Sequence, residues 1–537
     1  MRRLATLANL AWLAAGASAS RRFTRALAAP REAQEQVLRE QLGRGIGSTF
    51  GERFELAAVR GPADFARKVP LADYRELEPW IDRIRAGDKK VLSSEEVTHL
   101  VPTSGSTGAR KLIPFTASLG RAFDAAVAPW MRDLARKRPG LVDGPAYWSI
   151  SPLAAAPAET SVVPIGFADD AQYLGGLKAW LVGQVLAVPA SARLVREEAA
   201  FWPLVLLALL RQRELRLVSV WHPSFFELLV GAAAAHWPDL LEAVASGENP
   251  WREALPATWQ RQWAARPDRR RAAELRLLGP EAWPAWWPRL QVLSCWGEQA
   301  ARGGCERLQK RLPGVLVQPK GLLASEAVVT VPLGEARPLA LTSHFFEFLD
   351  DRGEIRLAHQ LERGGHYEVV VTAGCLWRYR LGDLVECTGH LAATPSLRFL
   401  GRAGNVSDLR GEKLAEAFVA EALRALWGSG KAPSLAVLEA WEEGHQAGYQ
   451  LLLSREDPAP GQAAELTGRL ESLLAENPHY ALARRLGQLE PLRLVELGGD
   501  AAAERLRQAG ASGVRLGDIK PNVLVARPPC RGPRSCG

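Results

Sequence analysis

Residues 101–116, VPTSGSTGARKLIPFT, form the segment whose residue types are best suited to bind an anion. It follows an apolar, strand-like stretch. Its phosphate-binding candidates are Ser104, Gly105, Ser106, Thr107, Gly108 and Lys111. Glycines let the main chain approach phosphate oxygens, and the hydroxyls and the lysine supply donors and positive charge. The Walker A pattern is absent, so the alternatives are another type of phosphate loop or a flexible Gly/Ser surface loop.

Two further segments place a carboxylate at a break between strand-like runs. In GVLVQPKGLLASEAVVTVPL, Glu326 falls between two such runs, where its oxygens suit a hard divalent cation. In CLWRYRLGDLVECTG, Asp383 follows Gly382 at an expected turn, where it suits the hydroxyls of a ribose. Alone, an A-S-E tripeptide means little, and Asp383 alone is better explained as an exposed turn residue. The weight of both motifs therefore depends on their order and spacing.

Lysine usage sharpens the choice of candidates. Of the 67 basic residues, 56 are arginines, so this chain uses arginine for generic positive charge. A lysine within a motif therefore indicates a task that a planar guanidinium does not fulfil. The net charge of +8 has much of its excess near the two ends and no recognition motif with it, so we do not expect nucleic-acid binding.

Length and composition predict a large globular enzyme. The 537 residues suffice for several domains, and 47% hydrophobic with 23% charged residues is ordinary soluble usage. The first twenty residues mimic a secretory signal, but Asn9 and Trp12 interrupt the apolar run, which favours an amphipathic helix. No apolar run reaches 18 residues, and the six cysteines lack metal-binding spacing. We therefore expect a cytoplasmic monomer with reduced thiols and no stable membrane insertion.

The order of patterns predicts an α/β fold with a large N-terminal domain of mostly parallel sheets and a small mobile α+β C-terminal domain. Residues 1 to about 90 have helical periodicity. From there to about 400, runs such as LRLVSVW and LQVLSCW alternate with helical stretches. The expected division is a domain over 1–400, a hinge over 401–413, a small domain over 414–525 and a disordered tail over 526–537.

Taken together, these motifs resemble those of the acyl-adenylate-forming superfamily, and most closely the auxin-responsive Gretchen Hagen family of acyl-acid amido synthetases. TSGSTGARK resembles the superfamily phosphate loop, LLASE the family's A-S-E element, and YEVVVT to YRLGDLVECTG its central block. NPHYALARRLGQL resembles bacterial members in particular, and GVRLGDIKPNVL resembles the end of the family pattern. The resemblance covers nearly the whole chain.

The resemblance implies a role for each matching residue. Ser104 to Thr107 and Lys111 would contact the ATP phosphates, and Glu326 would lie at the Mg²⁺ ion and phosphates. Ala324 and Ser325 would lie near the adenine, and Asp383 would bind the ribose. The hinge residues that would contact nucleotide or switch orientation are Arg402, Arg410 and Lys413, whereas Asp408 occupies a position where many relatives carry lysine. Lys520 resembles the mobile C-terminal lysine that reaches the adenylation site.

The implied reaction is ATP-dependent activation of a small carboxylic acid to an acyl adenylate, with Lys111 and Lys520 as the catalytic residues, followed by transfer to an amine. For this family an amino acid is the expected acceptor. An acyl-CoA ligase shares the first step, and we find no segment that separates an amine from a thiol acceptor. A non-catalytic binding or scaffold protein that keeps the fold is the third possibility, although the retained motif lysines and carboxylates argue against it.

Overall fold

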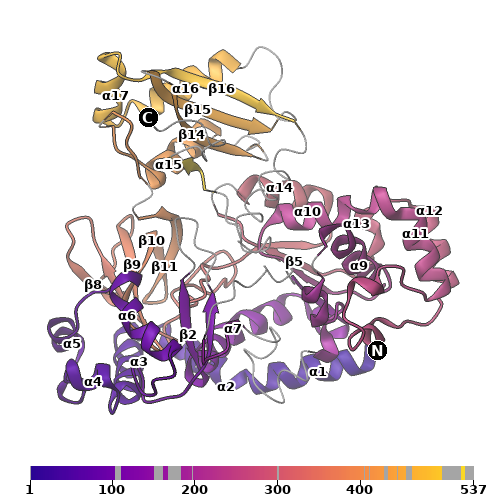
Figure 1. The fold of residues 1–537 in the computed structure, drawn as a ribbon, viewed down its shortest axis with the longest axis horizontal. Helices are drawn as coiled ribbons and strands as arrows, with labels where there is room; N and C mark the ends of the chain where they lie inside the picture. The colour runs from indigo at the N-terminus through magenta and orange to yellow at the C-terminus, as the bar shows by residue number, and fades with distance from the viewer. Residues whose placement is uncertain are drawn as a thin grey trace.

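The computed structural model describes most of the chain (Figure 1). The described residues are 2–102, 111–149, 161–166, 183–195, 197–298, 301–403, 406–410, 412–427, 433, 435–443, 446–454, 463–498 and 522–526.

The N-terminal region is helical, as predicted. Its helices are α1 (Arg2–Ala15), α2 (Ala17–Ala26), α3 (Pro30–Gly45), α4 (Thr49–Arg53), α5 (Pro62–Lys68) and α6 (Tyr74–Arg85). The side chain of Asn9 donates hydrogen bonds to the carbonyls of Val142 and Gly144, both at 3.0 Å. The polar residue that interrupts the apolar run thus anchors α1 to the protein. Helix α6 begins with a capping box, in which Asp73 and Glu76 satisfy the free backbone amides of its first turn.

A hairpin and a long helix follow. Strands β1 (Val97–Pro102) and β2 (Leu112–Thr116) are antiparallel, and α7 (Ala117–Lys137) starts directly after β2. Thr116 caps α7 by accepting a hydrogen bond from the amide of Leu119.

The predicted parallel sheet is present, in the order β3-β4-β5-β6. Its strands are β3 (Ala146–Trp148), β4 (Leu217–Ser219), β5 (Val292–Cys295) and β6 (Leu316–Pro319). The helices around it are α9 (Glu198–Leu210), α10 (Pro223–Gly231), α11 (Ala233–Ser246), α12 (Arg269–Leu278), α13 (Trp283–Trp286) and α14 (Ala301–Arg311). The strands consist of short, buried runs, as expected for a sheet covered on its faces.

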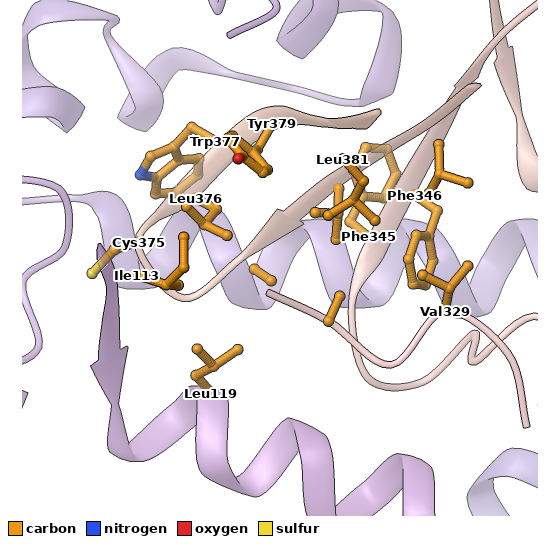
Figure 2. Packing of buried hydrophobic residues seen from close by; sticks show 14 of the residues in the cluster. Ile113, Leu119, Val329, Phe345, Phe346, Cys375, Leu376, Trp377, Tyr379 and Leu381 are labelled. Atoms are coloured by element: carbon orange, nitrogen blue, oxygen red, sulfur yellow. The ribbon is translucent and has the colours of Figure 1, made fainter. Parts of the chain in front are cut away.

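A second sheet of the N-terminal part is antiparallel, in the order β11-β10-β9-β7-β8. Its strands are β7 (Phe345–Leu349), β8 (Ile355–Leu357), β9 (His366–Ala373), β10 (Leu376–Leu391) and β11 (Thr394–Arg402). Figure 2 shows its buried side chains, among them Phe345, Phe346 and Trp377, packed with Ile113 of β2 and Leu119 of α7. This cluster joins the sheet to the β1–β2 hairpin.

The C-terminal elements have a hydrophobic cluster of their own. The sheet order is β16-β15-β14-β17, and β12 pairs with β13. The strands are β12 (Val406–Ser407), β13 (Leu414–Ala415), β14 (Ala436–Glu443), β15 (Gln446–Ser454), β16 (Glu490–Leu497) and β17 (Leu524–Val525). The helices are α15 (Glu416–Trp427), α16 (Ala463–Leu474) and α17 (Pro478–Arg485). In Figure 1 this group lies above β9–β11, with α15 nearest to them.

Two general features bear on the surroundings of the protein. Among the described residues, no helix has the length and apolar character needed to cross a membrane. The described cysteines Cys295, Cys305, Cys375 and Cys387 are buried and form no disulfide with one another.

Candidate active site

The β1–β2 hairpin holds together the two ends of the expected phosphate loop. Its register pairs Pro102 with Leu112, and Lys111 directly precedes the paired Leu112. The loop residues Ser104, Gly105, Ser106, Thr107 and Gly108 lie outside the described residues, so their role stays a prediction.

Two tyrosines surround the ammonium group of Lys111. Its Nζ lies 3.5 Å from the hydroxyl of Tyr379 on β10 and 5.7 Å from the centre of the Tyr74 ring on α6. The Tyr74 hydroxyl also accepts a hydrogen bond of 2.9 Å from the amide of Leu112, which fixes α6 against β2. Within the described part of the chain, Lys111 forms no ion pair with a carboxylate. Its charge is thus positioned by neutral groups and is available to an anion.

A tight turn presents Glu326. The amide of Ala324 donates to the carbonyl of Ala327 at 2.9 Å, and Leu323 pairs with Val328. At the base of this turn a Cβ on Gly321 would lie 2.2 Å from the carbonyl oxygen of Thr330, so only glycine fits there. Ala324 and Ser325 belong to the turn, as expected, but their contact with adenine stays a prediction.

Glu326 lies within electrostatic range of three other predicted site residues. Its burial raises the pKa of its carboxyl group, and the nearby Asp383 raises it further, whereas Arg402 and Lys111 lower it. Burial and Glu326 also raise the pKa of Tyr379. The structure therefore brings together Lys111, Glu326, Asp383 and Arg402, which come from three separate regions of the sequence. We call these four residues the charged cluster.

Asp383 is buried at a bulge rather than exposed at a turn. Gly382 has a φ of 72°, and the pairing of β10 with β9 shifts between Arg380 and Leu384. Asp383 is 1% exposed, and among the described residues its Oδ1 has no hydrogen-bond partner. Its nearest cation is Arg402, whose Nε lies 3.3 Å from that oxygen. A buried acceptor without a donor is costly, so Oδ1 is suited to receive a ligand hydroxyl.

The two arginines that precede Asp383 have structural partners. Arg378 is buried and makes two hydrogen bonds to Glu347, at 2.8 and 2.9 Å. It also donates to the carbonyls of Ala66 and Val69, which ties β10 to α5. Arg380 pairs with Glu368 on β9. Neither belongs to the charged cluster.

The predicted hinge residues Arg402 and Arg410 lie in different parts of the structure. Arg402 ends β11 beside Asp383, and the next amide, of Ala403, donates to the carbonyl of Gly382 at 2.7 Å. Arg410 instead pairs with Glu442 on β14 at 2.8 Å. Lys413 is exposed just before β13, with a φ of 45°, and its contact with nucleotide stays a prediction.

Lys520 lies outside the described residues. The strand that follows it, β17, pairs in parallel with β14. The amide of Val523 donates to Glu416 at the start of α15, at 3.0 Å.

Tyr74 and Tyr379 are the site residues that the sequence analysis missed. A signal for Tyr379 was present, because it stands within the YRLGD motif of a chain that has only seven tyrosines. Tyr74 is on a helix far from the other motifs along the chain, and no local pattern marks it.

The fold is that of an acyl-acid amido synthetase. The structure of the "GH3.15 acyl acid amido synthetase" superposes with a TM-score of 0.79 at 18% identity, over 94% of this chain and 93% of that chain. A family model described as the GH3 family N-terminal domain matches residues 19–317, and the GH3 family central domain matches residues 338–402. The chain therefore belongs to the GH3 family, the Gretchen Hagen family to which its motifs pointed.

Plant relatives are similar over much of the chain. The "Indole-3-acetic acid-amido synthetase GH3.2" of Arabidopsis thaliana is 26% identical over 73% of this chain and 78% of its own length. The "Probable indole-3-acetic acid-amido synthetase GH3.12" of Oryza sativa subsp. japonica is 23% identical over 94% of this chain and 92% of its own. The match to the rice relative extends through the C-terminal elements as well as the N-terminal part.

Proposed function

We propose that this chain uses ATP to convert a small carboxylic acid into an acyl adenylate and pyrophosphate, and then transfers the acyl group to the amine of an amino acid. The observation that carries this proposal is the charged cluster, in a chain of the GH3 family. Among the described residues it combines a lysine that forms no ion pair, a half-buried carboxylate and a buried carboxylate oxygen that receives no hydrogen bond. A nucleoside triphosphate offers a complement to each of them.

Each member of the charged cluster has a role in this proposal. Lys111 binds the phosphates and stabilises the charge that develops at the α-phosphate. Asp383 accepts hydrogen bonds from the ribose hydroxyls through Oδ1, which has no hydrogen-bond donor among the described residues. Arg402 balances the two carboxylates and marks the start of the hinge. Tyr74 and Tyr379 position the Lys111 ammonium, and the loop of Ser104 to Gly108 supplies hydrogen-bond donors to the phosphates.

The residues present fit a magnesium ion. Glu326 offers carboxylate oxygens, which Mg²⁺ prefers, and the ion usually completes its coordination with phosphate oxygens and water. Burial raises the pKa of Glu326, and a bound cation would act in the opposite direction and favour the ionised carboxylate. When bound, the ion would neutralise part of the triphosphate charge. Glu326 would hold it beside Lys111.

The two steps need two positions of the C-terminal elements in this account. Lys520 belongs to the segment just before β17 and would reach the reacting carboxylate and α-phosphate in the first position. Rotation about residues 401–413 would then withdraw Lys520 and admit the amine. Residues 522–526 are anchored to β14 and α15. This anchoring supports the proposal that Lys520 moves together with the C-terminal elements.

The choice of acceptor rests on the relatives. Several are named amido synthetases, which supports an amine over the thiol of CoA. A cytoplasmic location and a monomeric state stay predictions from the sequence.

A panel of carboxylic acids tests this proposal. Purified protein, ATP and Mg²⁺ are incubated with each acid, alone, with a mixture of amino acids, or with CoA. Pyrophosphate and acylated products are then measured. We expect acid-dependent pyrophosphate release and an N-acyl amino acid identified by mass. A thioester as the only product would replace the amide proposal, and no pyrophosphate with any acid would favour the non-catalytic alternative.

A further inference from the structure

The carboxyl end of the parallel sheet carries a group of residues outside the charged cluster. Backbone hydrogen bonds continue past the strand ends: the amide of Trp296 donates to Trp221, and the amide of Lys320 donates to Cys295, both at 2.7 Å. Trp221, Trp296 and Lys320 therefore follow β4, β5 and β6 side by side. Ligands of open parallel sheets bind in the crevice at this end of the strands.

Lys320 is a buried cation without a carboxylate. Its side chain is 6% exposed, and its Nζ lies 4.8 Å from the centre of the Trp221 ring. Within the described part of the chain it makes no ion pair and no side-chain hydrogen bond. Burial lowers its pKa to about 8, so it is still protonated at neutral pH. A buried ammonium without a carboxylate partner is costly.

A second polar group without a partner lies in the same region. Ser219, Ser294 and Gln318 are paired across β4, β5 and β6, and each precedes one of the three residues above by two positions. Residues two apart in a strand share a face of the sheet. Gln318 accepts a hydrogen bond from Trp130 of α7 at 2.6 Å, whereas the fully buried Ser294 hydroxyl has no partner among the described residues.

Lys320 differs from the charged cluster in the neighbours that act on its charge. The charged groups that act on Glu326 are Arg402, Asp383 and Lys111, whereas the titratable neighbour that acts on Lys320 within the described residues is the Cys295 thiol. The pKa values of Lys320 and Glu326 are therefore shifted by different neighbours, although only six positions divide the two residues along the chain.

We propose that Lys320, assisted by Ser294, binds a second acidic group of the carboxylic acid substrate, at the end remote from the reacting carboxylate. The substrate is then a dicarboxylic acid, whose second carboxylate supplies the counter-charge that Lys320 lacks among the described residues. This inference rests on the proposed function, because it names the class of acid that the enzyme activates. The ammonium is desolvated in advance, so an acid that lacks the second group leaves it unpaired and binds less well.

Matched pairs of acids test the inference. The specificity constant kcat/KM for pyrophosphate release is measured with hexanoate against adipate and with benzoate against terephthalate. We expect the unmodified protein to prefer at least one diacid over its partner by about 100-fold, as expected when a site built for a polar group meets a ligand that lacks it. Lys320→Met should abolish that preference by lowering the diacid value and leave the monoacid within about threefold.

Three further variants complete the experiment. Lys320→Arg should keep part of the preference, because it keeps the charge. Ser294→Ala should reduce it by about tenfold, as for one lost hydrogen bond to a charged group. Lys310→Met, which changes an exposed lysine of α14, should change nothing. A thermal-shift titration with the diacid, without ATP, gives a second readout: the shift should occur in the unmodified protein and be absent from Lys320→Met.

Several outcomes would overturn the inference. It is wrong if the unmodified protein activates monoacids but no diacid is preferred, or if Lys320→Met reduces both acids of a pair equally. Equal loss would mean that Lys320 contacts the reacting carboxylate. Failure of every acid to release pyrophosphate would instead reject the proposed function, and the inference with it.

Discussion

Lys111 and Lys320 carry the same charge in two different surroundings. Lys111 is half-buried between two tyrosines and lies near Glu326. Lys320 is buried against Trp221 and has no acidic partner in the described part of the chain. Arginine outnumbers lysine about fivefold in this protein, so both positions indicate a need for a compact ammonium.

We predict that Lys111→Met lowers kcat/KM for ATP by about 100-fold or more, as expected for loss of a charge that stabilises the transition state. Folding should be little affected, because its contacts are a long hydrogen bond and one ring. Steady-state pyrophosphate release at limiting ATP measures the effect. Lys89→Met, at an exposed position, is the control. An unchanged dependence of the rate on ATP concentration would show that Lys111 does not bind the phosphates.

Lys320 should reduce the stability of the free protein in a pH-dependent way. Its pKa is about 8 in the folded protein and near 10.5 when unfolded. Between these values the unfolded chain binds more protons, so the free energy of unfolding rises with pH and the penalty is fully present below about pH 8. Lys320→Met should therefore raise the free energy of unfolding by about 3 kcal/mol at pH 7, and by much less at pH 10.

Urea unfolding of the two proteins at both pH values measures this difference, with Lys310→Met as the control. A binding residue is expected to cost stability in the absence of its ligand. If Lys320→Met is less stable than the unmodified protein at both pH values, Lys320 has a structural partner and its role as a ligand-binding residue is rejected.

The elements that position the site follow sequence patterns to different degrees. The apolar runs before Trp221 and Trp296 predict β4 and β5. The Ala/Leu/Arg-rich stretch EAAFWPLVLLALLRQR predicts α9, and the amphipathic pattern after the hinge predicts α15. The run HYEVVVTAG has the same apolar character as the runs of the parallel strands, yet β9 belongs to the antiparallel sheet. A short apolar run does not specify its partner, because pairing direction depends on connections and packing far along the chain.

The surroundings of Asp383 show the same limit. The sequence identified the residue and its glycine, but it predicted a turn after a strand. In the structure both lie in β10, a strand that continues to Leu391, and the irregularity is a bulge. The bulge depends on simultaneous pairing with β9 and β11, which local sequence does not encode. The contact between Tyr74 and Lys111 could not be predicted either, because it depends on the packing of α6 against β2.

The bulge provides a prediction at the level of the element. Gly382 has a φ of 72°, and a Cβ there would meet its nearest atom only at 4.0 Å, so Gly382→Ala strains the backbone without a clash. We expect a cost of about 1 kcal/mol in stability and a raised KM for ATP, because relaxation of the strain moves Asp383.

Gly353→Ala is a matched control, since Gly353 has a φ of 76° and open space but lies in the turn between β7 and β8. It should share the loss of stability and keep the KM. Equal KM values for ATP in the two variants would show that Asp383 does not contribute to nucleotide binding.

At the level of the whole molecule, the C-terminal elements contact the antiparallel sheet near Arg402, the last residue of β11 and a member of the charged cluster. Gly401 of β11 lies so close to α15 that a Cβ there would be 3.3 Å from the amide nitrogen of Ala417. Arg402 is the next residue. A rotation about residues 401–413 would therefore be coupled directly to Arg402 and Asp383.

Lys520→Ala tests the two positions of the C-terminal elements. We predict that adenylate formation slows by about 100-fold or more, while transfer from a chemically synthesised acyl adenylate to the amine survives. Rapid-quench measurements of the two half-reactions separate the steps. If both rates fall together, or neither changes, Lys520 does not act in one position alone.

The most direct test of the proposed reaction is to trace the oxygen atoms of the acid with ¹⁸O. In the proposed reaction a carboxylate oxygen attacks the α-phosphorus of ATP, and pyrophosphate leaves. The amine then attacks the acyl carbon, the C–O bond breaks, and AMP leaves with that oxygen. An acid labelled with ¹⁸O in both carboxylate positions should therefore give AMP with one heavy oxygen and an amide that keeps the other. Label in inorganic phosphate, with ADP as the nucleotide product, or no label in AMP, would contradict the account.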